Sequence, residues 1–442
     1  MGHCFRAGAF AAAGALAAAC GNPPAGGPDA AGPFEWTAVI DGIEPALLSA
    51  CSEGTQATVV GGRDGDGLVL EWDGSTWMAA PLPSHPHTLW WCAGSGAGAW
   101  AVGEGGTVLR RGDTWVPVDT GGAVPVTAAL YGVWTDGPTT WVVGGDATGA
   151  GARPVIARHT ATGGWQAAAT GALPDGTLFK VWGASATDVW AVGSGGLILR
   201  YQEGAWAAMP SPTDERLIAV WGTADDDVYA VGGESGGLVL RWDGASWTRF
   251  AAPPEPLSGV WRAAGGPLYV GGNRGWLGRF ATAGGVPSAT ALTSTVALAD
   301  VDVHALAGAD GSVLAVGADL LGGGEPSWRG RLLVHGGGFG GELQLPPDGG
   351  ITGDDGAPAD AAADGGGGAG PGDVCPELPD TCADNLDCWL LLASNVAICT
   401  RLCGDASECT ADFGADACCE LPGFQAVDKV CIPGSYQECS PP

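Results

Sequence analysis

Few side chains in this sequence have the types and spacing that catalysis or metal binding requires. Apart from His3, the histidines are His85, His87, His159, His304 and His335. His85 and His87 could supply half of a metal site, because neutral imidazole is a common ligand, but the prolines around them favour a solvated loop. A nucleophile with an adjacent base is not evident. The sequence therefore predicts no catalytic centre and no cofactor.

Two acidic turns offer hard oxygen ligands, residues 63–67 (RDGDG) and 225–227 (DDD). Such carboxylates could hold Ca²⁺ with low affinity, but neither segment has the spacing of an EF-hand loop. Aspartate and glycine are also the residues that tight turns require. We expect turn formation and solvation to explain both segments.

One charged pair, Lys180 and Asp300, occupies corresponding positions in a sequence repeat, and Trp90 holds that position in an earlier copy. If the copies surround a common axis, these side chains meet at the mouth of a channel and could form a polar binding site. The alternative is an ion pair, or two separately solvated charges, without a ligand.

The end of the chain, residues 375–442, is dominated by cysteine. Such a density is typical of small exported domains in which disulfides replace a core, and the segment has neither a histidine nor a C-x-x-C knuckle for zinc. We predict five disulfides without assigning their pairing. The ten cysteines are Cys375, Cys382, Cys388, Cys399, Cys403, Cys409, Cys418, Cys419, Cys431 and Cys439.

Two further cysteines, Cys51 and Cys92, occupy the same position in the first two copies of the repeat, where most other copies carry tryptophan. We predict a disulfide between them. Equivalent positions in consecutive copies point the same way around a ring, which opposes a bond. Two buried thiols are the alternative.

The elements that must position these residues come from a repeat of about 40 residues. Each copy reads as four short β-strands, rich in Val, Leu and aromatic residues and separated by glycine-containing turns. The clearest copies read LFKVWG (178–183), DVWAVG (188–193) and LILRY (197–201), then LIAVWG (217–222), DVYAVG (227–232) and LVLRWDG (238–244). The tryptophan of the first strand, or its substitute, falls at Cys51, Cys92, Trp134, Trp182, Trp221, Trp261 and Asp302.

Seven four-stranded sheets of this kind can cover their faces by packing radially, so we predict an all-β, seven-bladed β-propeller of antiparallel blades with tryptophans buried between them. Residues 34–39 match a fourth strand and could close the ring, but residues 339–345 could fill the same place. We favour the N-terminal segment and expect the other to be an additional edge or loop. Two insertions, Gly144–Pro154 and Ala318–Trp328, should lie on one face and carry ligand contacts.

With these motifs the repeat resembles one found in exported, often lipid-anchored proteins of large high-GC bacteria. The resemblance spans residues 34–345 and implies architecture rather than activity. Residues 73–77 (DGSTW) and 243–247 (DGASW) also resemble the Asp-box of sialidase-like propellers. They are one residue too short, so we interpret them as hairpin turns.

Residues 1–19 have the order of an export signal: Arg6, an apolar run and small residues before Cys20. Leu16–Cys20 resembles the lipobox of bacterial lipoproteins, which implies lipidation of Cys20; cleavage without lipidation is the alternative. We expect residues 20–33 to be a flexible tether, 346–374 a disordered linker and 375–442 a separate cysteine-rich domain.

The charge balance of 18 basic against 48 acidic residues gives a net charge of −30, which repels nucleic acids and anionic lipid surfaces. The only expected membrane contact is a lipid anchor, with the cell envelope, specifically the outer membrane, as the expected location. We predict a non-catalytic recognition or scaffold protein that binds an extracellular protein or glycan through one propeller face, and through the cysteine-rich domain as well. The alternatives are an envelope-assembly lipoprotein and a propeller enzyme acting on extracellular polysaccharide.

Overall fold

We describe the protein from a computed structural model. It describes residues 35–63, 65–83, 87–146, 153–281, 289–299, 301–309, 311–319 and 328–344, and four strands between 387 and 432. The predicted signal, tether and linker lie outside these residues, as do most of the cysteine-rich segment and the lipidation site Cys20. Those assignments remain predictions.

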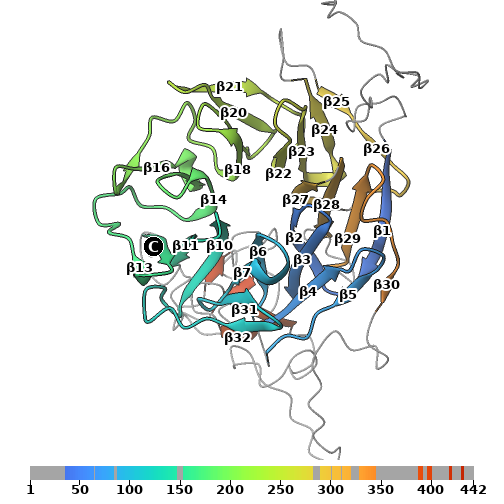
Figure 1. Ribbon diagram of the computed structural model, residues 1–442, viewed down its shortest axis with the longest axis horizontal. Helices are drawn as coiled ribbons and strands as arrows, with labels where there is room; N and C mark the ends of the chain where they lie inside the picture. The colour runs from blue at the N-terminus through green and yellow to red at the C-terminus, as the bar shows by residue number, and fades with distance from the viewer. Residues whose placement is uncertain are drawn as a thin grey trace, which may run out of the picture.

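Seven sheets are arranged around a central axis, which confirms the predicted seven-bladed propeller (Figure 1). Blades one to six each take four consecutive strands, and neighbouring strands within a blade are antiparallel. The innermost strands are β2 (Ala46–Glu53), β6 (Leu89–Ala93), β10 (Ala128–Thr135), β14 (Leu178–Ser185), β18 (Leu217–Ala224), β22 (Leu257–Arg262) and β27 (Asp302–Ala309). The second strands are β3 (Gln56–Arg63), β7 (Trp100–Gly103), β11 (Thr139–Asp146), β15 (Asp188–Gly193), β19 (Asp227–Gly232), β23 (Leu268–Gly272) and β28 (Ser312–Ala318).

The outer half of each blade consists of shorter strands. The third strands are β4 (Asp66–Trp72), β8 (Val108–Arg111), β12 (Arg153–Thr160), β16 (Ile198–Gln202), β20 (Leu238–Trp242), β24 (Leu277–Phe280) and β29 (Gly330–His335). The fourth strands are β5 (Trp77–Ala79), β9 (Trp115–Pro117), β13 (Gly164–Ala167), β17 (Ala205–Ala208), β21 (Trp247–Ala251), β25 (Ala289–Ala291) and, for the seventh blade, β1 (Glu35–Ile43). Short 3₁₀ turns occupy Gly96–Gly98 (η1), Ser194–Gly196 (η2) and Asn273–Gly275 (η3).

The ring closes through the N-terminal strand, as predicted. Strand β1 pairs antiparallel with β29 and so completes the seventh blade. The competing segment near residue 343 forms β30 (Leu343–Gln344), which pairs parallel with β5 on the outside of the first blade. Strand β26 (Thr293–Ser294) covers the outer edge of β1 in the same parallel manner. The N-terminal strand of the propeller therefore belongs to the seventh blade, and its C-terminal strand belongs to the first blade.

Each second strand carries a glycine at or near its end because of a close backbone approach. At Gly193 and Gly232 a side chain would overlap the carbonyl oxygen of the residue that precedes the innermost strand, Thr177 and Arg216 respectively. The same overlap occurs at the equivalent glycine of every blade. These glycines are Gly61, Gly103, Gly144, Gly193, Gly232, Gly272 and Gly317. This contact explains the final glycine of the DVWAVG motif.

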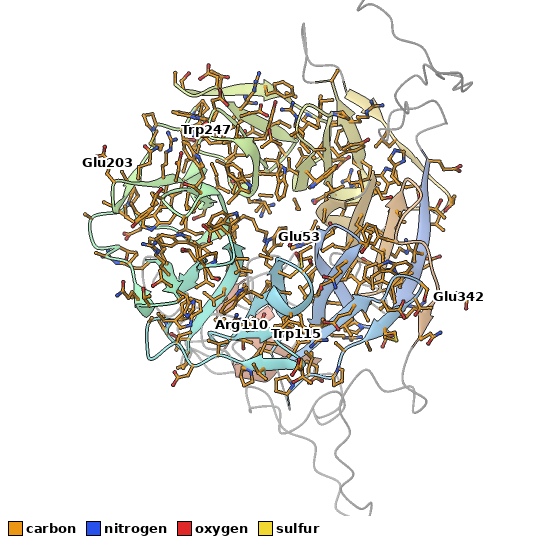
Figure 2. The ribbon with its side chains drawn as sticks, viewed as in Figure 1. Glu53, Arg110, Trp115, Glu203, Trp247 and Glu342 are labelled. Carbon is orange, nitrogen blue, oxygen red and sulfur yellow. A yellow bond between two sulfur atoms is a disulfide. The ribbon has the colours of Figure 1, made fainter. Side chains whose placement is uncertain are left out.

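Aromatic side chains and ion pairs fill the spaces between blades. Trp190 of β15 lies 5.0 Å from Trp242 and 5.3 Å from Trp247 of the next blade, measured between ring centroids. The guanidinium of Arg200 stacks on Trp190 at 4.4 Å and bonds both oxygens of Asp188 at 2.8 Å. The Asp, Trp and Arg of the repeat thus form one inter-blade unit, which confirms that these indoles are mainly packing groups. In Figure 2, Trp247 lies among packed side chains, whereas Glu203 and Glu342 lie at the outer rim.

The glycine of the VWG motif makes room for an indole. A side chain at Gly222 would collide with the ring of Trp182 from the preceding blade, and one at Gly183 would collide with Trp134. The sixth blade carries Arg262 at this position, and its carbonyl oxygen accepts a hydrogen bond of 2.9 Å from Trp221. Each first-strand tryptophan is therefore placed by the blade that follows it.

Two hairpins are described in the cysteine-rich segment. Strand β31 (Asp387–Leu391) pairs with β32 (Val396–Thr400), and β33 (Cys418–Glu420) pairs with β34 (Val430–Ile432). Their backbone registers place Cys388 opposite Cys399 and Cys419 opposite Cys431. Among the described residues, no helix is long and apolar enough to cross a membrane.

Candidate channel-mouth site

A β-bulge interrupts every innermost strand at the same point, one residue after a buried apolar residue near the start of the strand. An extra residue in one strand re-aims the side chain it carries. The bulged residues are Leu48, Trp90, Tyr131, Phe179, Ile218, Ser258 and His304. The innermost strands run side by side around the axis in Figure 1, so these bulges form a ring.

Side chains of this ring meet on its inner side. The rings of Trp90 and His304 lie 6.0 Å apart although β2 separates their strands. Tyr131 follows Trp90 at 5.6 Å, and Phe179 follows Tyr131 at 5.7 Å. A contact that skips a blade is made toward the axis, so this aromatic row lies on the axis side of the innermost strands.

The residues that follow the bulges make a second set of contacts. Lys180 is one of these residues. The ammonium nitrogen of Lys180 lies 3.9 Å from the ring centroid of Trp91, its counterpart two blades away. The residue between them is Gly132, where a side chain would collide with the backbone of Lys180. Absence of a side chain at Gly132 therefore lets the lysine reach Trp91. We call Trp90, Trp91, Tyr131, Phe179, Lys180 and His304 the mouth cluster.

Lys180 is buried without a carboxylate. Only 3% of its surface is exposed, and its ammonium donates a hydrogen bond of 2.8 Å to the carbonyl oxygen of Tyr131. Burial lowers the pKa of Lys180 to about 7, because the low-dielectric surroundings disfavour the charged form. Near neutral pH this amine is therefore divided between its charged and neutral forms.

His304 and Tyr131 both stay neutral across the physiological range. Burial, followed by the nearby charge of Lys180, lowers the pKa of His304 to about 3. Its Nδ1 lies 2.5 Å from the carbonyl oxygen of Leu48, which requires the proton on Nδ1. Burial, followed by the charge of Glu104, raises the pKa of Tyr131 to about 12. Glu104 accepts a hydrogen bond of 3.3 Å from the indole of Trp90.

Two features of the predicted site need correction. The residue that corresponds to Lys180 in the second blade is Trp91, because Trp90 is the bulged residue. In the seventh blade it is Ala305, because β27 begins only at Asp302 and its bulge lies at His304. Asp300 lies outside the described residues, in a segment (298–302, LADVD) that resembles the LFKVW and LIAVW segments of other copies and that overlaps only the first residue of β27.

Sequence reasoning missed Trp91, Tyr131, Phe179 and His304. Aligning the copies on the apolar residue before each bulge, rather than on the tryptophan, would have brought them together. Those apolar residues are Leu47, Leu89, Leu130, Leu178, Leu217, Leu257 and Val303.

Cys51 and Cys92 are joined by a disulfide, with their Cα atoms 5.8 Å apart. They do not occupy the same position, contrary to the sequence alignment: Cys51 is four residues beyond Leu47, and Cys92 three beyond Leu89. Successive residues of a strand point to opposite faces. A difference of one position therefore turns the two side chains toward each other across the interface of blades one and two.

The other predicted ligands are arranged as turn and packing groups. Among the described residues, no group of three or more His, Cys, Asp or Glu side chains could hold a metal ion. His85 lies outside the described residues, and His87 is exposed. Asp227 pairs with Arg241 and Arg262 between blades.

Asp73 shows the chemistry of the Asp-Gly hairpin turns. Its Oδ1 accepts backbone hydrogen bonds of 2.7 Å from both Ser75 and Thr76. These bonds lower the pKa of Asp73 to about 2. Asp243 accepts equivalent bonds from Ala245 and Ser246. Hairpin turns thus account for the segments that resemble an Asp-box.

The mouth cluster lies near the face on which both insertions begin. Bulges occur near the start of the innermost strands, and second strands end at the same side of a blade, because neighbouring strands are antiparallel. Trp328, the last residue of the insertion in the seventh blade, packs with Trp90 against a buried cluster around Leu48. Val126, in the connection between blades two and three, is 82% exposed on this face. Residues 147–152 and 320–327 of the insertions lie outside the described residues.

No protein-family model matches the chain, and no curated protein matches it. Solved structures do. The WD40 β-propeller domain of Doa1 matches with a TM-score of 0.50 at 8% identity, covering 68% of this chain and 97% of that one. YCF48 from Cyanidioschyzon merolae matches with a TM-score of 0.50 at 17% identity, covering 68% of this chain and 98% of that one. YCF48 bound to a D1 peptide matches at 0.47 and 16% identity, covering 68% and 96%. At these identities the likeness shows the propeller fold alone.

Proposed function

We propose that this protein is a non-catalytic recognition scaffold of the cell envelope, whose propeller binds a segment of an extracellular protein or glycan at the channel-mouth face. The observation that carries the proposal is the mouth cluster, which gathers four large aromatic residues, a lysine and a histidine from four blades at one end of the propeller axis. Export and lipid anchoring rest on residues 1–20 and are part of the proposal.

The chemistry of the cluster suits recognition. Trp90 and Tyr131, both half-buried, offer large, stiff contact surfaces that lose little conformational entropy on binding, and the buried Phe179 packs behind Tyr131. The surrounding blades are locked by inter-blade stacking and ion pairs, so the cluster is preorganised. A ligand that covers this end of the ring would also contact the exposed Val126.

The test uses one charge placed on each face. Val126→Glu alters the channel-mouth face, and Thr55→Glu alters the turn between β2 and β3 on the opposite face. Both residues are exposed, so neither change should affect folding. Binding of the purified chain from residue 20 onward is measured on a glycan array and against fractionated envelope proteins.

We expect Val126→Glu to weaken binding of whichever ligand is found by roughly tenfold or more, as for a contact near the centre of an interface, and Thr55→Glu to leave it unchanged. Equal loss in both variants, or loss in Thr55→Glu alone, would contradict the assignment of this face.

A further inference from the structure

In the fourth and fifth blades, an arginine of the third strand is paired with a carboxylate of its own blade. Arg200 bonds Asp188 in the fourth blade, and Arg241 bonds Asp227 in the fifth. Each of these arginines lies opposite an aromatic residue of the second strand, and each aspartate stands two residues before that aromatic residue. In these copies the repeat therefore supplies its own anion at a fixed place beside a stacked guanidinium.

The second blade has the arginine without the acid. Arg110 lies opposite Trp100 in the strand register, and its guanidinium carbon is 5.3 Å from the centroid of that ring. Two residues before Trp100 the chain carries Gly98 in place of aspartate. Arg110 is exposed, and among the described residues its guanidinium has neither a carboxylate nor another hydrogen-bond acceptor.

The place of the missing carboxylate is open. The first atom of a side chain at Gly98 would meet no other atom within 4 Å, and Gly98 does not have a positive φ angle that would exclude a side chain. The amide of Arg111 donates a hydrogen bond of 2.8 Å to the carbonyl oxygen of Ala99, which keeps Gly98 beside the end of β8. A carboxylate from outside the chain can therefore approach Arg110 from this side.

The third blade adds a second nitrogen donor at the same place. His159 lies opposite Trp165, where the fourth and fifth blades have an aromatic ring opposite the equivalent tryptophan. The ring centroids of His159 and Trp165 lie 5.8 and 5.9 Å from that of Trp100. Neither ring nitrogen of His159 bonds to a described residue. Burial, followed by the charge of Arg110, lowers the pKa of His159, and no acidic side chain of the described propeller offsets this effect.

We propose that Arg110 and His159 form a binding site for one carboxylate group, which belongs either to a small free acid or to an acidic side chain. The guanidinium bonds both carboxylate oxygens, as Arg200 does with Asp188 at 2.8 Å, and an N–H of the imidazole donates a further bond. A single carboxylate is favoured over a polyanion, which the net charge of −30 repels. Arg110 lies farther from the axis than Glu53 does (Figure 2), so this site is separate from the mouth cluster and does not rest on the proposed function.

NMR of histidine rings labelled with ¹³C tests the site in the purified chain from residue 20 onward, and His159→Gln assigns the signal of His159. One probe is propionate, a free acid. The other is an aspartate blocked at its amino and α-carboxyl groups, which represents a side chain, and the tighter of the two identifies the source. We expect carboxylate to move the signals of His159 and to leave those of His304 and His335, which are buried and report an intact fold.

Three variants separate a built site from general attraction. Arg110→Gln should weaken binding roughly tenfold or more, as for the loss of a hydrogen bond between charged groups. Gly98→Asp supplies the missing carboxylate from the chain itself and should weaken binding to the same extent. Gly171→Asp adds the same charge at another glycine with open space around it, and should leave binding unchanged.

Four results would overturn the proposal. They are a His159 signal that responds to neither carboxylate, tighter binding of sulfate than of either carboxylate, undiminished binding by Arg110→Gln, and undiminished binding by Gly98→Asp.

Discussion

At the scale of single residues, Lys180 lowers the stability of the propeller. Its pKa is about 7 in the folded chain, against about 10.4 for an unperturbed lysine. Between these values the unfolded chain binds more protons than the folded one, so the free energy of unfolding rises with pH from about 7 to about 10. Below pH 7 the full penalty is present.

Lys180→Met should therefore be more stable than the parent at pH 7. We expect this advantage to shrink by about 1.4 kcal/mol for each pH unit between 7 and 10. Urea unfolding followed by tryptophan fluorescence measures it. The exposed Arg153→Met is the matched control and should show no such dependence; a constant advantage for Lys180→Met across this pH range would refute the assigned cause.

The glycine at or near the end of each second strand gives a second residue-scale prediction. Gly232→Ala pushes a methyl group into the carbonyl of Arg216 and should lower the free energy of unfolding by roughly 1–3 kcal/mol, as overpacking does. Gly171 has open space around it, so Gly171→Ala should change stability by less than about 0.5 kcal/mol. Similar losses in the two variants would show that the close approach is relieved without cost.

The sequence predicted residue types better than residue register. The repeat located Lys180 and Trp90, and it indicated that the tryptophans pack between blades. It misplaced the seventh copy for two reasons. Ala307 replaces the tryptophan of the first strand, and the nearby residues 298–302 (LADVD) resemble the start of that strand in other copies. It also hid the bulges, since an extra residue in one strand is visible only in the pairing with its neighbour.

At the scale of elements, the disulfide ties the first two blades together. Cys51 and Cys92 are 41 residues apart, and a cross-link closing such a loop contributes roughly 2–4 kcal/mol. The double variant Cys51→Ala, Cys92→Ala should lose that amount in denaturant unfolding under oxidising conditions. Adding reductant to the double variant should have no further effect on the propeller. An unchanged midpoint, together with two free thiols in the parent, would contradict the pairing.

The N-terminal strand is the element that closes the ring. Trp36 of β1 is fully buried, 5.7 Å from the ring of His335 in the neighbouring strand. Trp36→Ala should cost roughly 3–5 kcal/mol and expose the amides of β29 to hydrogen exchange. Thr37→Ala, at the next and exposed position, is the control. Continued protection of β29 in Trp36→Ala would argue that β1 is dispensable for closure.

The sequence left this closure open for a physical reason. Residues 34–39 and 339–345 both have strand-forming patterns and competed for one place, so the second segment was expected only as an additional edge or loop, without a partner strand. The structure uses both segments, because β30 adds to β5 in a parallel pairing on another blade. Pairings made by two-residue strands depend on neighbours that are distant in sequence, so no local pattern indicates them.

At the scale of the whole molecule, the closed ring creates two unlike faces from a repeated unit. Every blade contributes a turn between its first two strands to one face. The opposite face receives the connections between blades and both insertions, next to the mouth cluster. That cluster is asymmetric, because blades two to four carry aromatic side chains at the bulges, whereas blades five and six carry Ile218 and Ser258.

Photocrosslinking from single positions tests this account most directly. A benzoylphenylalanine is placed at residue 126 on the channel-mouth face, or at residue 55 on the opposite face, in the full chain produced in its own cells. Irradiation should produce a discrete cross-linked species from position 126 and none from position 55. Adducts from position 55 alone, or identical adducts from both positions, would contradict recognition at the channel mouth.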